Sequence, residues 1–488
     1  MKVSKGYRTL FITQLCPYPA RGGGAMRVWQ NLNILAQSGE VVLFSIFKGP
    51  HPRTILNRIN NLPTLRQTQG KLPPPPVWLR HSASAQSSRA HTEAHLPTWH
   101  HYDIGAPQRS RREKIVRRLG WLRPDGHPRA DWLYTRQAAQ QLKDVIQQFR
   151  PTLIICAEIW LYRYLPILRS ARCPVILDNH NVEGDAKRFQ ATQNTLSKIR
   201  HIERHWLQHA DQVWTCSQTD RDLLEQLYPQ TSTSLQIIPN GVDPTFYTTL
   251  KTNPTDPTSL PATRYPLPAT PPPSSPPPSP PAFLGNETLA PTIASPSPLS
   301  PDWAGTRPAP PPPPLTLLFP GRFSYPPNAE AAAVLINHIY PALKQQVSDC
   351  QLLLVGIDPT PQMISAAADP DIIVTGEVDD VRPYLAMECI MVVPLQSGSG
   401  TRLKLLEAFA AGCPVVSTPK GAEGLAVQDG QQLYLRSTPA AIVEAVLELW
   451  HNPDRGQQLA KNAYACLLQH YAWSAVANRI EEALAGLP

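Results

Sequence analysis

The stretch PLQSGSGTRLKLLEAFAAGCPVVSTPKGAEGL (residues 394–425) decides how the C-terminal half of this 488-residue chain folds. It follows the apolar run CIMVVP (residues 389–394), which has the length and composition of a buried strand. A Gly/Ser loop then leads to Thr401, which we expect to cap a helix that ends at Gly412. Residues 413–418 are typical of a second strand. Strand, glycine loop, helix and strand together predict a parallel crossover.

The glycine loop of this crossover has the composition of an anion site. In a parallel crossover the helix N-terminus faces the carboxyl edge of the sheet, where free backbone N–H groups and the helix dipole favour a phosphate. Lys404 and Glu407 are three residues apart, on one side of the helix and within reach of a group held by the loop. One interpretation is a phosphate, its counter-charge and a carboxylate that accepts sugar hydroxyls. The alternative is a glycine loop that only turns a corner.

Length and composition predict a chain of two or three globular domains with disordered segments between them. Hydrophobic residues make up 42% of the sequence, while 56 prolines concentrate in a few stretches that cannot bury a core. The eight cysteines are scattered and form no Cys-x-x-Cys pair, which argues against a disulfide framework or a zinc site and favours a cytoplasmic location. We expect neither a signal peptide nor a membrane-spanning run.

The charge is distributed unevenly along the chain. Residues 1–247 hold 32 Lys and Arg against 17 Asp and Glu, a net charge of +15, and the remaining residues hold 13 against 20, a net charge of −7. The densest basic stretch, Arg109–Arg123, also carries apolar residues. It predicts either an amphipathic segment on an anionic membrane surface, which makes the protein peripheral at the inner face of the cell membrane, or a solvated basic loop. No recognition module accompanies the charge, so a nucleic-acid partner is not expected.

A second glycine loop opens the N-terminal half. An expected strand over residues 8–14 is followed by Gly22, Gly23 and Gly24, by an amphipathic helix, and by a strand over residues 41–47. Three consecutive glycines let a backbone approach a ligand closely, but they do not fit G-x-G-x-x-G. A nicotinamide cofactor is therefore not expected.

The rest of the N-terminal half alternates between strands and helices, apart from one interruption. Residues 62–113 are rich in Pro, Ser, Gln and His and predict a long loop or insertion. Helices are expected at residues 131–149, 161–168, 184–209 and 218–227, and strands at residues 152–156, 174–178, 212–216 and 235–238. The polar sequence NHNVE (residues 179–183) follows one of these strands directly. The alternation predicts a doubly wound parallel sheet.

A Pro/Ser/Thr-rich tether over residues 248–314 separates this half from a second alternating set. Strands are expected there at residues 315–319, 351–355 and 372–374, and helices at residues 329–345, 361–368, 381–387, 439–450, 456–469 and 473–487. The predicted fold class is α/β, with Rossmann-like domains at residues 1–247 and 315–470. A cleft between them would bring the carboxyl edges of both sheets face to face.

Nine segments of the sequence resemble one known family. They are FITQLCPYPARGGG, VILDNHNVE, ADQVWTCSQTD and IIPNGVD in the N-terminal half, and PGRFSYPPNAEAA, LLLVG, VTGEVDDVRPYL, VVPLQSGSGTRLKLLEAFAAGCPVVST and GAEGL in the C-terminal half. Together these segments closely resemble the retaining GT-B glycosyltransferases of family four. The branch that they resemble most assembles exopolysaccharides or lipid-linked glycans.

The resemblance implies a nucleotide-sugar donor on the C-terminal domain and a glycan, lipid-linked or small-molecule acceptor on the N-terminal one. It also implies that residues 471–488 form a helix that returns to the N-terminal domain. The donor is a co-substrate, and no cofactor is expected. No Asp-x-Asp motif occurs in these loops to hold a divalent ion, so a metal-independent site is predicted.

Positions in the C-terminal half match the donor site of this family. Glu407 matches a glutamate that accepts the nucleotide ribose, and Arg322 an arginine that binds the diphosphate. Two positions depart from the family. The family has two paired glutamates, of which Glu407 matches the second, and Ser399 stands in place of the first. Asn328 replaces a lysine whose charge Lys404 is expected to supply. Gly376 and Glu377 match positions where the backbone approaches the base, and the N–H groups of residues 400–402 are expected to bind the diphosphate. The other expected donor-binding residues of the glycine loop are Gly398, Ser399, Gly400 and Thr401.

In the N-terminal half, His180 matches the active-site histidine of the family, and Gly23 and Gly24 match its glycine loop beside the diphosphate. Each charged residue also has a purely structural interpretation: a strand-end histidine for His180, a surface ion pair for Arg322 and helix support for Glu407. Two other functions stay open. They are a GT-B nucleotide-sugar epimerase or phosphorylase, and a non-catalytic sugar-binding protein that the change at Ser399 suggests.

Overall fold

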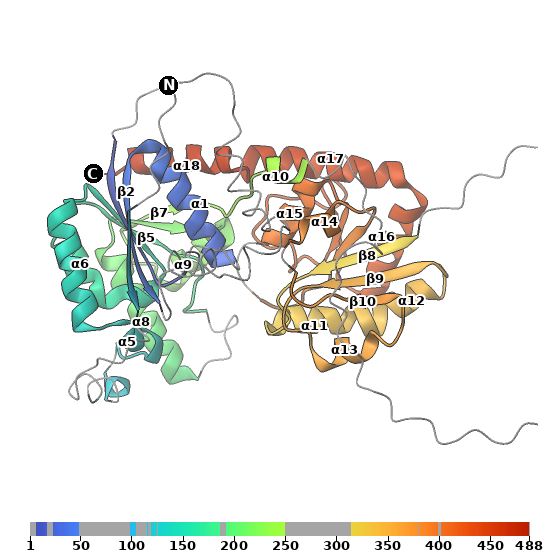
Figure 1. Ribbon diagram of the computed structural model, residues 1–488, viewed down its shortest axis with the longest axis horizontal. Helices are drawn as coiled ribbons and strands as arrows, with labels where there is room; N and C mark the ends of the chain where they lie inside the picture. The colour runs from blue at the N-terminus through green and yellow to red at the C-terminus, as the bar shows by residue number, and fades with distance from the viewer. Residues whose placement is uncertain are drawn as a thin grey trace, which may run out of the picture.

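The computed structural model describes residues 6–16, 23–47, 98–103, 115, 119–123, 125–185, 192–248, 314–378, 380–398 and 402–487. Two α/β domains lie side by side, each with helices packed around one parallel sheet (Figure 1). The predicted fold class is therefore confirmed. The expected tether at residues 248–314 and most of the expected insertion at residues 62–113 lie outside the described residues.

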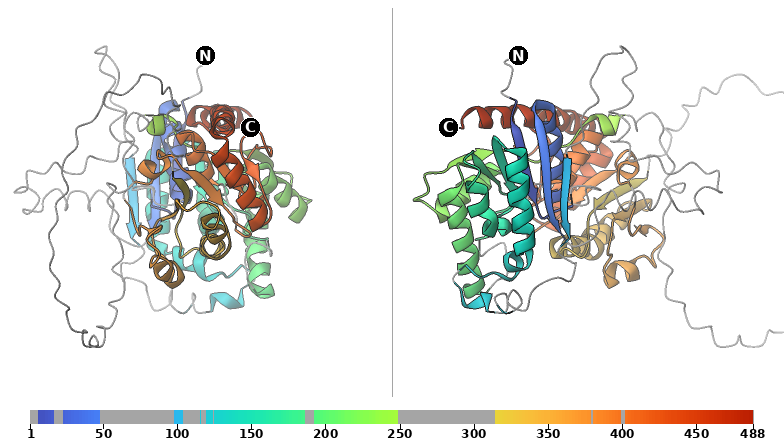
Figure 2. Two further views of the ribbon diagram at one scale, coloured as in Figure 1. Left: turned by 90° about the vertical axis from the view of Figure 1, so that its right-hand side faces the viewer. Right: turned by 60° about the vertical axis from the view of Figure 1, so that its left-hand side comes forward.

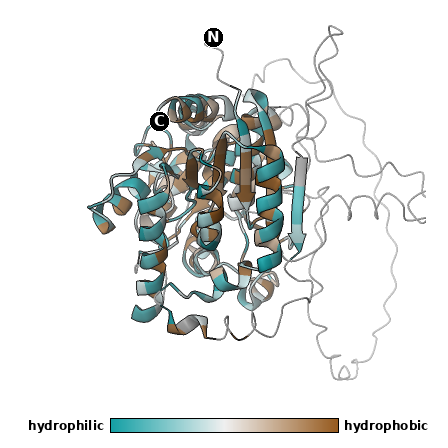
Figure 3. Cartoon of the chain, turned by 90° about the vertical axis from the view of Figure 1, so that its left-hand side faces the viewer, coloured by the Kyte–Doolittle hydropathy of each residue, from teal (hydrophilic) through white to brown (hydrophobic). Residues whose placement is uncertain are grey.

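The N-terminal domain has a seven-stranded sheet in the order β3-β2-β1-β4-β5-β6-β7, with parallel pairing throughout the described strands. The strands are β1 (Arg8–Thr13), β2 (Glu40–Phe47), β3 (Thr98–Asp103), β4 (Leu153–Ala157), β5 (Val175–Asp178), β6 (Gln212–Thr215) and β7 (Ser234–Ile237). The helices are α1 (Gly23–Ser38), η2 (Gly120–Leu122), α5 (Pro128–Leu133), α6 (Arg136–Phe149), η3 (Ile159–Tyr164), α7 (Leu165–Arg169), α8 (Gln193–His209) and α9 (Gln218–Leu227). The short helix α10 (Thr245–Thr248) follows them in the chain but packs into the C-terminal domain through Tyr247. The inner strands are continuous apolar runs because helices cover both faces of the sheet (Figure 3).

The C-terminal domain repeats this plan with a six-stranded sheet in the order β10-β9-β8-β11-β12-β13. Its strands are β8 (Leu315–Pro320), β9 (Cys350–Val355), β10 (Ile372–Val374), β11 (Ile390–Val393), β12 (Val415–Ser417) and β13 (Tyr434–Leu435). Its helices are α11 (Pro326–Val334), the π-helical turn η5 (Leu335–Ile339), α12 (Tyr340–Lys344), α13 (Pro361–Ala366), α14 (Arg382–Leu385), α15 (Leu403–Ala411), α16 (Pro439–His451) and α17 (Pro453–His470). In each sheet the strand order reverses between two central strands, β1 and β4 or β8 and β11, and such a switch point forms a crevice for ligands.

The last helix, α18 (Trp473–Ala485), continues from α17 and packs on the N-terminal domain (Figure 1). Val476 and Ile480 share a buried apolar cluster with Phe11 of β1 and Val28 of α1. The side-chain amide of Gln212 donates a hydrogen bond to the carbonyl oxygen of Ala483 (3.0 Å). The C-terminal end of the chain therefore ties the two domains together.

Strand β3 was not predicted. It falls inside the expected loop of residues 62–113, yet it pairs in parallel with β2 along its whole length, from Thr98 opposite Val42 to Asp103 opposite Phe47. The strand lies at the edge of the sheet (light blue in Figure 2, right). An edge strand has one partner strand and needs no continuous apolar run. The polar sequence TWHHYD therefore gave no sign of a strand.

Three helix starts also differ from their predictions. The helix expected at residues 131–149 is two helices, because the Thr135 side chain caps α6 by accepting from the N–H of Ala138. Helix α8 begins at Gln193, so the expected start at residue 184 is wrong. Thr401 lies outside the described residues, and Arg402 occupies the cap position of α15 without a side-chain cap, so the predicted Thr401 cap is wrong.

Candidate functional site

Two helix N-termini meet where the carboxyl edges of the two sheets approach each other. Helix α1 follows the switch-point strand β1, and α15 follows the switch-point strand β11. A β-carbon placed on Gly23 would lie 3.5 Å from Cδ1 of Leu403, so the first residues of the two helices are neighbours although they belong to different domains. Free N–H groups and helix dipoles at this point favour an anion.

His180 lies next to these helix starts. It follows β5, and its side chain is only 6% exposed. A β-carbon on Gly24 would lie 3.3 Å from its Nδ1 and 2.9 Å from Cδ1 of Leu15, so only a glycine leaves the imidazole uncrowded here. The structure thus brings together Gly23, Gly24 and His180, which are far apart in the sequence.

A buried ion pair that sequence analysis missed supports His180. Arg27 of α1 donates to Oδ1 of Asp178 from Nε (2.8 Å) and Nη2 (2.6 Å), and both side chains are fully buried. Oδ2 of Asp178 accepts from Asn31 (2.9 Å) and lies 3.3 Å from Nε2 of His180. Burial by itself would raise the pKa of Asp178, but the charge of Arg27 and the contact with His180 lower it to about 2. Asp178 is therefore ionised and orients the imidazole.

Glu158, directly after β4, is a second residue that was missed. Its Oε1 lies 3.6 Å from Nδ1 of His180, and its Oε2 accepts a hydrogen bond from Arg129 (3.3 Å). Burial by itself would lower the pKa of His180, but Asp178 on one side and Glu158 on the other raise it. The signal available in the sequence was an acidic residue directly after an apolar strand run.

The turn after His180 is held by another buried acid. Glu203 of α8 accepts hydrogen bonds from the N–H groups of Glu183 (2.7 Å) and Gly184 (3.0 Å) and from the hydroxyl of Tyr228 (2.6 Å). Burial raises the pKa of Glu203 to about 7, although these hydrogen bonds act in the opposite direction. These contacts explain why the chain forms a turn at Gly184 where a helix was expected.

On the C-terminal domain, Lys404 occupies the region of the missing family lysine. Its Nζ donates to Oδ1 of Asn328 (3.0 Å) and lies 4.1 Å from the centre of the Phe319 ring. Burial, together with the charge of Arg402, lowers the pKa of Lys404 to about 7. The Lys404 side chain is therefore fixed beside Asn328, the residue that replaces the family lysine.

Arg322 lies on the other side of Asn328, whose side-chain amide donates to the Arg322 carbonyl oxygen (2.9 Å). The guanidinium is 53% exposed and pairs with Asp358 at 3.3 Å. A surface ion pair is thus what the structure shows for Arg322, with the side chain still accessible to a ligand. Asn328 connects the two cations that sequence analysis assigned to the diphosphate.

Glu407 is contacted by Tyr247 of α10, whose hydroxyl donates to its Oε1 (3.4 Å) and whose ring packs in the core of the C-terminal domain. Burial raises the pKa of Glu407 to about 7, and the hydrogen bond from Tyr247 and the charge of Lys404 oppose this. Next to this contact, Arg382 donates to the carbonyl oxygen of Phe246 (3.3 Å). Glu407 is therefore held by a helix that precedes the C-terminal domain in the chain but packs inside it.

The remaining predicted donor-binding residues lie in two loops, after β10 and after β11. Gly376 follows β10 with a φ of 71°, and Glu377 is exposed. Gly398 has a φ of 99°, and a β-carbon there would lie 3.0 Å from the hydroxyl of Tyr325, so this position requires glycine. Ser399, Gly400 and Thr401 lie outside the described residues.

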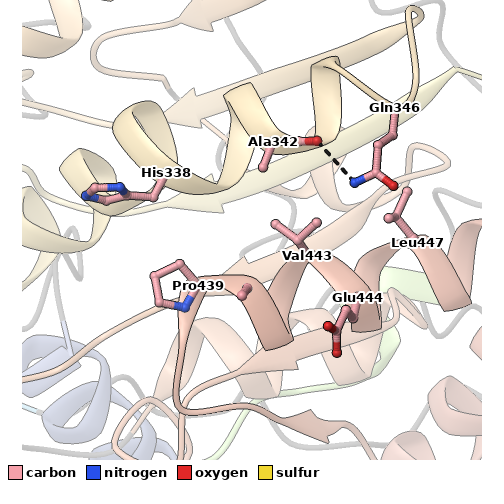
Figure 4. A pocket seen from close by; sticks show the side chains of 8 residues that line it. His338, Ala342, Gln346, Pro439, Val443, Glu444 and Leu447 are labelled. Atoms are coloured by element: carbon pink, nitrogen blue, oxygen red, sulfur yellow. Dashed lines mark hydrogen bonds between the residues drawn. The ribbon is translucent and has the colours of Figure 1, made fainter.

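A surface groove elsewhere on the C-terminal domain contains none of these residues. It lies between the η5–α12 segment and α16, and Figure 4 shows its lining side chains. The lining residues are His338, Ala342, Gln346, Pro439, Ala440, Val443, Glu444 and Leu447. Within the described ranges, no three His, Cys, Asp or Glu side chains gather to hold a metal ion, and no helix is both long and apolar enough to span a bilayer.

Comparison with solved structures shows which fold this is. Sucrose-phosphate synthase from Thermosynechococcus elongatus superposes with a TM-score of 0.58 at 16% identity, over 98% of each chain. Anabaena Alr3699/HepE, solved with UDP and glucose, superposes with a TM-score of 0.56 at 14% identity, over 99% of this chain and 100% of that one. At these identities the likeness concerns the fold alone, which is GT-B.

The two domains also match two families. Residues 314–452 match the family described as Glycosyl transferases group 1, and residues 93–246 match the one described as Glycosyltransferase Family 4. Together these matches cover more than half of the chain. The chain belongs to the GT-B glycosyltransferases. The N-terminal match takes in His180 and Glu158, and the C-terminal match takes in Arg322 and Glu407.

Curated relatives of this glycosyltransferase match over a shorter length. It is 32% identical over 172 residues to a phosphatidyl-myo-inositol mannosyltransferase of Mycobacterium leprae, covering 34% of this chain and 45% of that protein. It is 23% identical over 163 residues to an uncharacterised 44.6 kDa protein from the cps region of Klebsiella pneumoniae, covering 32% of this chain and 42% of that protein. The matched part thus spans less than half the length of these relatives.

Proposed function

We propose that this glycosyltransferase moves a hexose-type sugar from a nucleoside diphosphate to a hydroxyl group of a glycan or lipid acceptor, with retention of configuration and without a metal. The meeting of the α1 and α15 N-termini next to His180 carries this proposal, because it offers an anion site at the boundary between the two domains. The relatives support a hexose donor: one is named a mannosyltransferase, and one fold neighbour was solved with UDP and glucose.

In the proposed reaction the bond between C1 of the sugar and the diphosphate oxygen breaks, and C1 bonds to the acceptor oxygen. The acceptor proton passes to the departing diphosphate. Negative charge grows on that leaving group, and the helix N-termini, Lys404 and Arg322 would stabilise it. Glu407 would accept hydrogen bonds from the hydroxyl groups of the donor's ribose. Closure of the two domains would exclude water, whose attack on the donor competes with transfer.

A thermal-shift screen against UDP-, GDP- and dTDP-sugars tests donor binding. A donor at one hundred times its Kd should stabilise the folded protein by about 2.7 kcal/mol. Glu407→Ala should remove most of this shift, while Glu444→Ala, an exposed glutamate on α16, should leave it unchanged. The proposal fails if no nucleotide sugar shifts the transition and Glu407→Ala leaves nucleotide affinity unchanged.

Assays of nucleotide release distinguish the other functions. Turnover that requires inorganic phosphate would identify a phosphorylase, and conversion of one nucleotide sugar to another an epimerase. Donor binding without any release of nucleoside diphosphate would identify a non-catalytic binding protein. The same assay with EDTA tests the proposal that no metal is needed, since an enzyme of this kind should keep its rate.

We also propose that the N-terminal domain docks on an anionic membrane surface. Ile115, Leu119 and Leu122 are 56%, 51% and 61% exposed and follow one another at helical spacing, with the N–H of Leu119 bonded to the carbonyl oxygen of Ile115 (2.9 Å). The surrounding sequence Arg109–Arg123 is strongly basic. Exposed apolar side chains beside basic ones are typical of a segment that lies in the headgroup region. A lipid acceptor, as the name of the mycobacterial relatives indicates for them, would be reached there.

Cosedimentation with phosphatidylglycerol vesicles tests the membrane proposal. Charge reversal across residues 111–118, or serine at Ile115, Leu119 and Leu122 together, should abolish binding. Leu468→Ser is a matched control, because Leu468 is 46% exposed on α17. Unchanged binding of the triple variant would refute the proposal.

A further inference from the structure

The backbone of Glu158 adopts a conformation that side chains disfavour. At the carboxyl end of β4, its φ is 70° and its ψ is 150°, a region that is populated almost only by glycine. Its N–H donates to the carbonyl oxygen of Asp178 (3.0 Å), which holds the strained peptide against the end of β5. A glycine would take this conformation without strain, so the presence of a glutamate requires an explanation in its side chain.

The side chain of Glu158 faces the candidate site. Its Oε2 is held by Arg129 at 3.3 Å, and the Arg129 guanidinium stacks 4.9 Å above the ring of Trp160. Its Oε1 faces Nδ1 of His180 at 3.6 Å, and the carboxylate is 15% exposed. The glutamate is thus oriented by a partner on one side and remains available on the other.

Glu158 and His180 face each other as an ion pair that does not close to a hydrogen bond. At 3.6 Å the two groups are too far apart for a hydrogen bond, and Nδ1 of His180 has no hydrogen-bond partner among the described residues although it is buried. Buried polar atoms normally have partners, so an unpaired one beside a strained residue indicates a ligand. Because the carboxylate is partly exposed, a hydroxyl group that approaches this pair can donate a hydrogen bond to Oε1 of Glu158.

We propose that Glu158 binds the acceptor hydroxyl group that receives the sugar, with the carboxylate oxygen Oε1 that faces His180 accepting a hydrogen bond from it. This inference rests on the proposed function. As the acceptor binds, its hydroxyl donates to Oε1 of Glu158, which leaves an oxygen lone pair free to approach the donor sugar beside Gly24. The same proton passes to the departing diphosphate when C1 bonds to the acceptor oxygen. This role would account for the strained backbone of Glu158, because its conformation (φ 70°, ψ 150°) directs the carboxylate toward His180.

Donor hydrolysis tests the inference without an identified acceptor, since water takes the place of the acceptor hydroxyl. With UDP-glucose and GDP-mannose as probes, Glu158→Gln should lower the hydrolysis kcat at least tenfold, which is the loss of one hydrogen bond to a charged group. Glu158→Gly should lower kcat further while it raises the Tm, because glycine relieves the strain. Affinity for UDP and GDP should be unchanged in both variants.

Arg172→Gly is the matched control, because Arg172 is exposed and has a φ of 54°. It should raise the Tm without changing kcat. A wild-type kcat for Glu158→Gly would overturn the inference, and so would a loss of nucleotide affinity equal to the loss of kcat. If the unaltered protein binds and hydrolyses no donor, the proposed function itself fails and the role of Glu158 fails with it.

Discussion

Replacing Arg27 with methionine should destabilise the N-terminal domain more than any surface change. The Arg27 guanidinium makes four hydrogen bonds: two to Asp178, one to the carbonyl oxygen of Ile238 (2.5 Å) and one to Asn240 (2.9 Å). Methionine has a similar volume but leaves the buried charge of Asp178 uncompensated. Removing one partner of a buried pair costs about 3–5 kcal/mol, which corresponds to a Tm lower by roughly 10 °C for a domain of this size.

The pH dependence provides a second test of the same ion pair. Arg27 outweighs burial and holds the pKa of Asp178 near 2, below its ordinary value of 3.8. In the unaltered protein this carboxylate stabilises the fold by about 2 kcal/mol above pH 4, and that contribution is lost as the pH falls from 4 towards 2. In Arg27→Met the charge of Arg27 no longer opposes the effect of burial, so the pKa of Asp178 rises. Protonation of Asp178 at low pH then removes the uncompensated buried charge that destabilises this variant. The stability difference between the two proteins should therefore narrow on acidification.

Urea denaturation followed by tryptophan fluorescence, from pH 7 down to about pH 2, measures both the loss of stability and its pH dependence. The double variant Arg27→Met/Asp178→Asn is the control, because it removes both charges and should recover much of the lost stability. The argument is refuted if Arg27→Met costs less than 1 kcal/mol, if the difference does not change with pH, or if the double variant is no more stable than the single one.

Three further predictions test the site and the fold around it. The pKa values of Glu407 and Lys404 are both about 7, so the gain of the carboxylate charge and the loss of the ammonium charge have opposite effects on nucleotide affinity as the pH rises. In a Lys404→Met background the affinity should therefore rise through pH 7; Tyr247→Phe should move that midpoint upward and Glu407→Gln should abolish it, as isothermal titration would show. Gly24→Val should lower nucleotide affinity at least tenfold, because its side chain would crowd His180; an unchanged Kd would contradict this. Gly356→Ala should destabilise the C-terminal domain by more than about 2 kcal/mol in urea, because φ is 144° there and a β-carbon would lie 1.8 Å from a backbone oxygen; a loss below 1 kcal/mol would contradict it.

Much of the fold could be predicted from local sequence patterns. The apolar runs at β1, β4, β8 and β9 have the length and composition of strands buried on both faces, and the helices between them repeat at helical spacing. Strand β3 escaped prediction because an edge strand is stabilised by the backbone of its partner, which leaves little trace in its own side chains. The starts of α6 and α15 were misplaced because capping depends on geometry that residue type alone does not set.

The candidate site also combines features that local sequence predicts with contacts that it does not. The sequence by itself determined that glycines follow β1 and β11, and that Lys404 and Glu407 share one side of a helix, because these are properties of neighbouring residues. Only the tertiary structure decided that Gly23 would lie against Leu403, that Arg27 would pair with Asp178, and that a strained Glu158 would face His180. Strand order and burial bring these residues together across separations of 22 to 380 positions. No local preference of the backbone encodes such contacts, whereas the order of parallel strands imposes them.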